Sequence, residues 1–194
     1  MEVSVETALK EEQELVARLK ADDPGAIDEI VEKYKRQLFA FILRMIGNHE
    51  TAEDIFQETW MRVVRSVKHF RGDSRFSTWL FQIAGNLCRD SLRKSKKGIL
   101  VPLEEADSVT CEPGVDPFRI MEAEQVRRAV NELPIKMREV IVLRYFHDMT
   151  DSEISQVIGC PLGTVKTRFH RAIKILSVKW KIRVQSPYSK EGSV

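Results

Sequence analysis

The stretch "MTDSEISQVIGCPLGTVKTRFHRAIKIL", residues 149–176, decides the fold of the C-terminal part of the chain. Thr150 followed by Glu153 matches a capping box, in which two residues satisfy the first backbone amides of a helix. Gly159 is suited to end that helix, because the left-handed conformation at a helix end favours glycine. Apolar periodicity then predicts a second, longer helix over about 163–176. Two helices joined by such a turn form a helix-turn-helix.

The second predicted helix has one apolar face and one basic face. Five apolar side chains are expected to point inward: Val165, Phe169, Ala172, Ile173 and Leu176. Four polar side chains share the outward face: Lys166, Thr167, His170 and Arg171. These can donate to base edges in the major groove, and the flanking Arg168 and Lys174 suit phosphates. A merely solvated basic helix is the alternative, but residues 160–184 hold seven Lys or Arg and no acid, which favours DNA binding.

Charge is distributed in blocks along the 194 residues, although the net charge is only +2. Residues 86–97 hold five Lys or Arg and one acid, whereas residues 98–121 hold five acids and one Arg. The third block is the basic segment 160–184. Two basic blocks separated by an acidic one suggest two anion-binding surfaces, joined by a segment that does not bind to them.

The remaining composition indicates a globular chain without a metal or a cofactor. Hydrophobic residues make up 43% and charged residues 31%, as in ordinary globular domains. Cys88, Cys111 and Cys160 form no paired motif and the histidines lack ligand spacing, so we expect neither a disulfide nor a metal site. The first residues do not resemble a secretory signal, and no apolar run is long enough to span a membrane. We therefore expect a cytoplasmic protein.

Helical periodicity dominates the rest of the chain. Before the acidic block it predicts three helices, at about 26–46, 51–67 and 77–93. Thr51 and Asp54 are expected to form a capping box at the start of the second helix. That helix is expected to bury its apolar side chains: Ile55, Trp60, Val63, Val64 and Val67. Two-residue alternation is almost absent, so we expect no strands.

The predicted fold class is all-α, with two small helical domains joined by a flexible acidic linker. We assign the first domain to residues 10–97, the linker to 98–119 and the second domain, which contains the helix-turn-helix, to 120–183. Prolines, glycines and acids interrupt the helical pattern in the linker. Residues 184–194 are expected to be a disordered tail.

A second informative stretch is "HFRGDSRFSTWLFQIAGNLCRDSLRKSKK", residues 69–97. On the helix predicted from about residue 77, a polar and aromatic stripe recurs every three or four residues: Trp79, Gln82, Asn86, Arg89 and Arg93. Phe70 and Phe76 precede this helix. Flat aromatic faces beside cations are typical of surfaces that bind unpaired bases. The alternative is that the aromatic side chains belong to the core and the cations are only solvated.

Two longer segments together resemble a known family. The segment "AEDIFQETWMRVVRSVKHFRGDSRFSTWLFQIAGNLCRDSLRK" is followed, across the linker, by "ELPIKMREVIVLRYFHDMTDSEISQVIGCPLGTVKTRFHRA". This combination is similar to the extracytoplasmic-function (ECF) group of bacterial RNA polymerase sigma factors. The resemblance implies a first domain that binds the polymerase β′ subunit and melts the −10 promoter element. It also implies a second domain that reads the −35 element and docks on the β subunit, and an anti-sigma factor as a further partner.

The resemblance also implies roles for particular residues. Core polymerase is bound from the helix at 51–67, through Asp54, Gln57, Glu58 and Arg62. The −10 element is contacted by Phe70, Trp79, Asn86, Arg89 and Arg93, of which Phe70 and Asn86 match positions that hold a flipped base. The −35 element is contacted by Lys166, Thr167, Arg168, His170 and Arg171. Gly85 departs from the expected pattern: it costs a helix about 1 kcal/mol relative to alanine and is expected to loosen the pocket around Asn86.

Two other classes of function remain as alternatives. An ordinary helix-turn-helix regulator would use only the second domain for DNA, and would leave the polar cluster at residues 54–58 and the stripe from Trp79 unexplained. An enzyme acting on nucleic acid would need paired carboxylates, a phosphate-binding loop or an activated nucleophile, and none can be recognised in the sequence. We therefore expect no catalytic residues and no small-molecule substrate.

Overall fold

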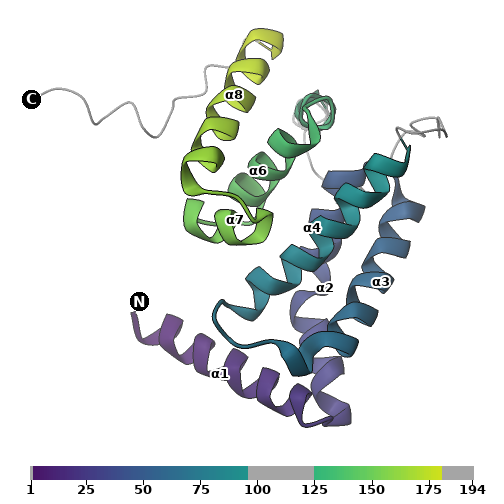
Figure 1. Ribbon diagram of the computed structural model, residues 1–194, viewed down its shortest axis with the longest axis vertical. Coiled ribbons are helices and arrows are strands. Elements are labelled where there is room, and N and C mark those ends of the chain that lie inside the picture. The colour runs from purple at the N-terminus through teal and green to yellow at the C-terminus, as the bar shows by residue number, and fades with distance from the viewer. Residues whose placement is uncertain (1, 96–124, 181–194) are drawn as a thin grey trace, which may run out of the picture.

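The computed structural model describes residues 2–95 and 125–180 (Figure 1). Within these ranges the chain forms α-helices, one 3-10 turn and no strand, so the predicted all-α class is confirmed. No helix in these ranges has the length and apolar character needed to cross a membrane. The predicted linker at 98–119, with Cys111, and the predicted tail at 184–194 lie outside the described residues.

The N-terminal helices form one group in Figure 1. Their bounds are α1 Glu2–Lys20, α2 Pro24–Ile46, α3 His49–Ser66, η1 Val67–His69 and α4 Phe76–Ser95. Asp23 caps α2 by accepting a hydrogen bond from the Gly25 amide at 3.0 Å. Gly47 ends the helix with φ 82°, a left-handed conformation that suits glycine. The apolar periodicity that predicted a helix at about 26–46 comes from side chains that are buried here, among them Ile30, Tyr34, Leu38, Phe41, Ile42 and Met45.

The start of α3 differs from the sequence prediction. The cap is Asn48, whose side chain accepts a hydrogen bond from the Thr51 amide at 2.8 Å. The predicted capping box of Thr51 and Asp54 is therefore wrong, and the helix begins two residues earlier. The physical reason is the turn at Gly47, which leaves Asn48 extended and its amide oxygen in reach of the third helical residue.

The C-terminal helices follow the predicted helix-turn-helix. Residues 125–131 are helical and lead to α6 Ile135–Phe146, α7 Asp151–Ile158 and α8 Leu162–Trp180. Both halves of the capping box of Thr150 and Glu153 are present at the start of α7. Gly159 ends α7 with φ 68°, as predicted.

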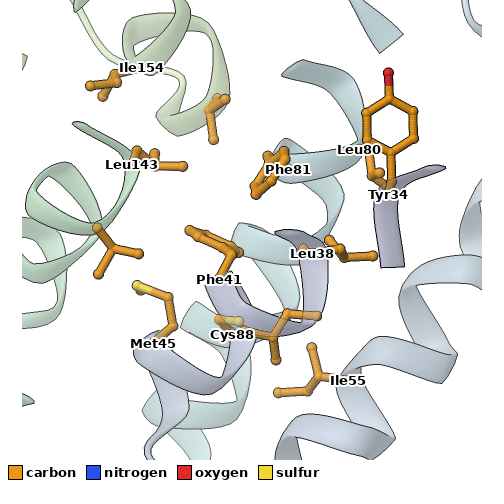
Figure 2. Packing of buried hydrophobic residues seen from close by; sticks show 14 of the residues in the cluster. Tyr34, Leu38, Phe41, Met45, Ile55, Leu80, Phe81, Cys88, Leu143 and Ile154 are labelled. Atoms are coloured by element: carbon orange, nitrogen blue, oxygen red, sulfur yellow. The ribbon is translucent and has the colours of Figure 1, made fainter. Parts of the chain in front are cut away.

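The two groups of helices pack against each other across the gap in the described chain. α7 lies on α4, and α6 lies on α2. Figure 2 shows Leu143 of α6 next to Phe41 and Phe81, which belong to α2 and α4. All these side chains are part of one buried apolar cluster. The C-terminal helices therefore cover part of the surface of α4.

Candidate nucleic-acid interface

The outward face of α8 has the composition predicted for it. Its inward side chains Val165, Phe169 and Ala172 are almost fully buried. The four predicted base-facing side chains are exposed: Lys166, Thr167, His170 and Arg171. The Thr167 hydroxyl donates to the carbonyl of the preceding turn, at Gly163, over 2.8 Å, which leaves its oxygen lone pairs for other donors. This face can approach the floor of a DNA groove with several donors in one row.

Arg168, predicted to flank this face, lies beside it and is not part of the exposed row. Its guanidinium Nη1 lies 3.6 Å from the Cys160 Sγ, and the side chain is half-buried. It also attracts the buried carboxylate of Glu139 in α6. One step along a helix rotates a side chain by about 100°, so Arg168 turns towards α6 and α7 while its neighbour Thr167 faces outward.

The polar side chains of α3 lie off its buried face. Asp54 and Gln57 are exposed, and Glu58 is half-buried. The Arg62 Nε donates to the Glu58 Oε1 at 2.8 Å, a pair four residues apart on the helix surface. These groups are accessible to an outside partner, since the side chains of Arg62 and Glu58 keep 47% and 38% of their exposure in the ion pair.

One apolar prediction for α3 is wrong. Val64 was expected in the core but is 52% exposed, and Met61 beside it is 49% exposed. Both line a shallow hollow of about 370 Å³ together with Trp60, whose ring is buried, and Ile27 and Val31 of α2. The apolar stripe of α3 is wider than the surface that α2 and α4 cover, so one edge of it remains on the outside.

An aromatic cluster lies at the start of α4. The Phe70 ring centroid is 5.0 Å from that of Trp79 and 6.0 Å from that of Phe76. Phe76 is buried, with its ring centroid 5.7 Å from that of Tyr34, whereas Phe70 and Trp79 are half-buried. Phe76 is therefore a core residue, as one of the two interpretations of these aromatic side chains predicted. Phe70 and Trp79 instead form the accessible edge of the cluster.

Further along α4, the C-terminal helices contact the predicted base-binding residues. The guanidinium of Arg89 forms an ion pair with the Glu139 carboxylate of α6 and also donates to the Asn86 side-chain oxygen at 2.5 Å. Asn86 itself remains exposed, and so does Arg93, which lies 3.5 Å from Asp90. A DNA strand that uses Arg89 must therefore displace Glu139.

Glu139 is fully buried at this contact. Burial raises the pKa of its carboxyl to about 7, although Arg89 and Arg168 act in the opposite direction. One carboxylate oxygen, Oε2, has no hydrogen-bond partner within the described residues. The contact between the two groups of helices therefore carries a desolvation cost, because the buried charge of Glu139 is compensated incompletely.

Gly85 makes this contact sterically feasible. A Cβ atom at this position would lie 2.8 Å from the Glu139 Oε1 and 3.4 Å from the Arg89 Nη1. Only glycine lets α6 bring its carboxylate this close to the α4 backbone. The glycine was expected to loosen a pocket, but its structural role is this close approach of two helices.

Other residues at the same junction were not recognised in the sequence. The Arg138 Nη1 donates to the carbonyl oxygen of Met45 at 2.6 Å, near the C-terminus of α2. The His147 ring centroid lies 5.8 Å from that of Phe41 and 4.9 Å from that of Phe81. Burial lowers the pKa of His147 to about 4, and the nearby positive charge of Arg44 acts in the same direction. The available signal was the charged pair Arg138 and Glu139 directly before the apolar run at 140–143, where buried charged side chains are rare unless they are paired.

Comparison with known proteins identifies the family. Residues 30–98 match the family model Sigma-70 region 2, and residues 123–176 match Sigma-70, region 4. The ECF RNA polymerase sigma factor SigW of Bacillus subtilis is 34% identical over 174 residues, which cover 83% of this chain and 92% of that protein. The chain belongs to the ECF sigma factors. It therefore acts in transcription initiation, as a protein that directs RNA polymerase to promoters.

Other similar proteins agree with this assignment. The RNA polymerase sigma-H factor of Pseudomonas aeruginosa is 30% identical over 174 residues, which cover 84% of this sigma factor and 90% of that one. The solved complex of CnrH with the cytosolic domain of CnrY matches with a TM-score of 0.68 and 22% identity, over 89% of this chain and 99% of that chain. RpoE in complex with the anti-sigma factor NepR from Bartonella quintana has a TM-score of 0.68 and 24% identity, over 81% and 98%. These two structures establish the fold.

Proposed function

We propose that this sigma factor reads a promoter through two separate surfaces and holds core polymerase through a third. The observation that carries the proposal is the exposed row of Lys166, Thr167, His170 and Arg171 on the second helix of a helix-turn-helix. A separate aromatic and basic edge on α4 supports a second DNA contact. Residues 10–97 are the domain for the −10 element and polymerase, residues 98–119 are the linker, and residues 120–183 are the domain for the −35 element.

Recognition of the −35 element occurs in the major groove. The outward face of α8 offers a cation, a hydroxyl and an imidazole to base edges, and Arg171 extends the row. Arg168 supports α6 and α7 from the other side of the helix and makes no base contact. Since much of the affinity comes from phosphates, added salt weakens this binding steeply.

Melting of the −10 element uses the accessible edge of α4. A base that leaves the stack is held by Phe70 and Asn86, and Trp79 supports the separated strand. Arg89 contacts the strand farther along the helix, and Arg93 extends the basic surface towards its end. The contact between Arg89 and Glu139 has to open for this step, so α6 withdraws from α4 before or during promoter binding.

Binding to core polymerase uses the polar surface of α3. Asp54, Gln57, Glu58 and Arg62 meet the β′ subunit, and the C-terminal helices dock on the β subunit. The chain carries no catalysis of its own, needs no cofactor and works in the cytoplasm. An anti-sigma factor controls it, because a related fold has been solved with the anti-sigma factor NepR bound to it.

Run-off transcription tests this proposal. The full-length chain is added to sigma-free bacterial core polymerase with promoter DNA from its own genome. We expect discrete transcripts that depend on the added chain and that define the two promoter elements. A chain that binds duplex DNA alone but neither binds core polymerase nor yields transcripts would favour the helix-turn-helix regulator instead.

A further inference from the structure

A groove with mostly apolar walls lies between α2 and the C-terminal helices, and we call it the α2 groove. Its volume is about 640 Å³. Phe39 and Leu43 of α2 line one side. The opposite side belongs to the C-terminal helices and includes Val126, Val130 and Phe146. Val126 is 40% exposed and Phe146 is 43% exposed, and apolar side chains gathered at one surface indicate an interaction site.

Two arginine side chains of α2 stand at this groove. Arg36 and Arg44 are eight residues apart and therefore lie on the same face of the helix. Arg36 is exposed, whereas Arg44 is half-buried with its guanidinium 4.4 Å from the centroid of the Phe146 ring. Burial lowers the pKa of Arg44, and no carboxylate within residues 2–95 and 125–180 offsets this effect. A carboxylate that enters the α2 groove therefore meets a partly desolvated guanidinium, which favours an ion pair.

The occupant that fits these walls combines an apolar run with carboxylates and carries no cation. The linker contains such a segment at residues 99–107, "ILVPLEEAD", which lies outside the described residues. Four apolar side chains are followed in it by three acids: Ile99, Leu100, Val101 and Leu103, then Glu104, Glu105 and Asp107. The later part of the linker fits less well, because Arg119 interrupts its apolar residues at 118–121.

The linker also ends at the α2 groove. Residues 96–124 separate the two described ranges, and Val126, which lines the groove, comes only two residues later. Between Leu103 and Val126 there are 22 residues, and a chain of this length reaches up to about 70 Å. A segment tethered in this way is present at an effective concentration on the order of 1 mM. A weak contact is then enough to fill the groove.

We propose that the linker segment 99–107 docks in the α2 groove. Its apolar side chains pack on the walls of the groove, and its carboxylates lie at Arg36 and Arg44. Because one wall comes from α2 and the other from the C-terminal helices, the docked segment joins the two groups of helices. The linker thus stabilises the contact of α6 with α2, and any partner that separates the two groups must also displace the segment.

Disulfide trapping in the full chain tests this docking. Ala40, which lines the α2 groove, and Leu100 are both replaced by cysteine, in a chain that also carries Cys111→Ser and Cys160→Ser. The remaining Cys88 is fully buried. In a glutathione buffer, the equilibrium between the thiols and their disulfide gives the effective concentration of the two thiols. A disulfide needs Cβ atoms about 4 Å apart, so it reports a segment that is inside the groove.

The matched control moves the α2 cysteine out of the groove. Lys35 lies five residues before Ala40, which turns its side chain by about 140° around the same helix, and it does not line the groove. We expect the effective concentration for Ala40→Cys with Leu100→Cys to be at least about tenfold higher than for Lys35→Cys with Leu100→Cys. Equal values for the two pairs would refute the proposal.

Charge reversal tests the role of the carboxylates. Glu104→Lys with Glu105→Lys should lower the effective concentration of the Ala40 pair about tenfold, because like charges then meet at the groove. Reversal of two later acids, Glu112→Lys with Asp116→Lys, should leave it nearly unchanged. Arg36→Glu should lower it as well.

Arg36→Glu combined with Glu104→Lys should recover most of this loss, because the pair of opposite charges is then restored. Altered folding would give no such recovery. Charge variants that all keep the wild-type effective concentration would refute the contact with the arginines.

Three further outcomes bear on the identity of the occupant. If Ala40→Cys does not fold, Asn131→Cys in the opposite wall replaces it and should give the same excess over the control. A higher effective concentration for Phe118→Cys than for Leu100→Cys would assign the groove to the later part of the linker and overturn the proposal. Disulfide-linked dimers of a chain that carries Ala40→Cys without Leu100→Cys, increasing with protein concentration, would show a second copy in the groove and overturn it too.

Discussion

Replacing Gly85 by alanine should separate the two groups of helices while making α4 itself more stable. Alanine is better than glycine inside a helix by about 1 kcal/mol. At this position, however, the added Cβ would lie 2.8 Å from the Glu139 Oε1. Glu139 is fully buried and has little room to move away. The same methyl group therefore stabilises α4 and destabilises the contact between α4 and α6.

The expected size of the effect follows from the junction. Overpacking a close contact costs about 1–3 kcal/mol, and displacing Glu139 also disturbs its ion pair with Arg89. A net loss of about 2 kcal/mol corresponds to a shift of roughly 30-fold from docked towards separated helices. Because Arg89 is then released, binding of a single-stranded −10 oligonucleotide to the chain alone should become tighter.

Small-angle X-ray scattering on the full chain measures this separation, and fluorescence anisotropy measures binding of the oligonucleotide. Gly163→Ala is a matched control, because a Cβ there meets no atom within 4 Å. We expect a larger radius of gyration for Gly85→Ala and an unchanged one for Gly163→Ala. A folded Gly85→Ala chain with the scattering and the oligonucleotide affinity of the wild type would show that Gly85 is not needed for the contact between α4 and α6.

Three other predictions concern the same surfaces. Burial raises the pKa of Glu139 from 4.5 to about 7, so docking takes up a proton between these values: the protonated carboxyl should favour docking fully below about pH 4.5, and this contribution should be lost progressively as the pH rises to about 7. Glu139→Gln should remove this dependence of the scattering profile. The double alanine variant of Gln57 and Glu58 should weaken the affinity for core polymerase roughly tenfold without lowering the melting temperature. The double alanine variant of Lys166 and Arg171 should lower −35 binding by at least about tenfold and reduce its salt dependence, while the affinity for core polymerase is unchanged.

The helices and their ends were largely predictable where the signal is local. Thr150, Glu153 and Gly159 lie within one short helix and its cap, and the structure confirms the predicted role of each. The outward face of α8 followed from the spacing of its apolar side chains in the same way. Such features depend on side chains that are close in sequence, so the packing of distant elements changes them little.

Predictions failed where two chemically similar choices were close together. Asn48 and Thr51 are both good caps, and the turn at Gly47 decided for Asn48. Val64 continues the apolar stripe of α3, but α2 and α4 leave it uncovered. In each case the neighbouring elements, and not the residue type, made the difference.

From the residues alone it was predictable that the chain is helical, that it holds a helix-turn-helix and which side of α8 carries the donors. These features were predictable because hydrogen bonds and apolar periodicity within a helix extend over only a few residues. The packing of the helices was needed to show that Glu12 caps α4, 64 residues away, and that Glu139 pairs with Arg89, 50 residues away. These contacts depend on how whole helices cross, and a carboxylate in the sequence does not indicate which distant amide or guanidinium it will meet.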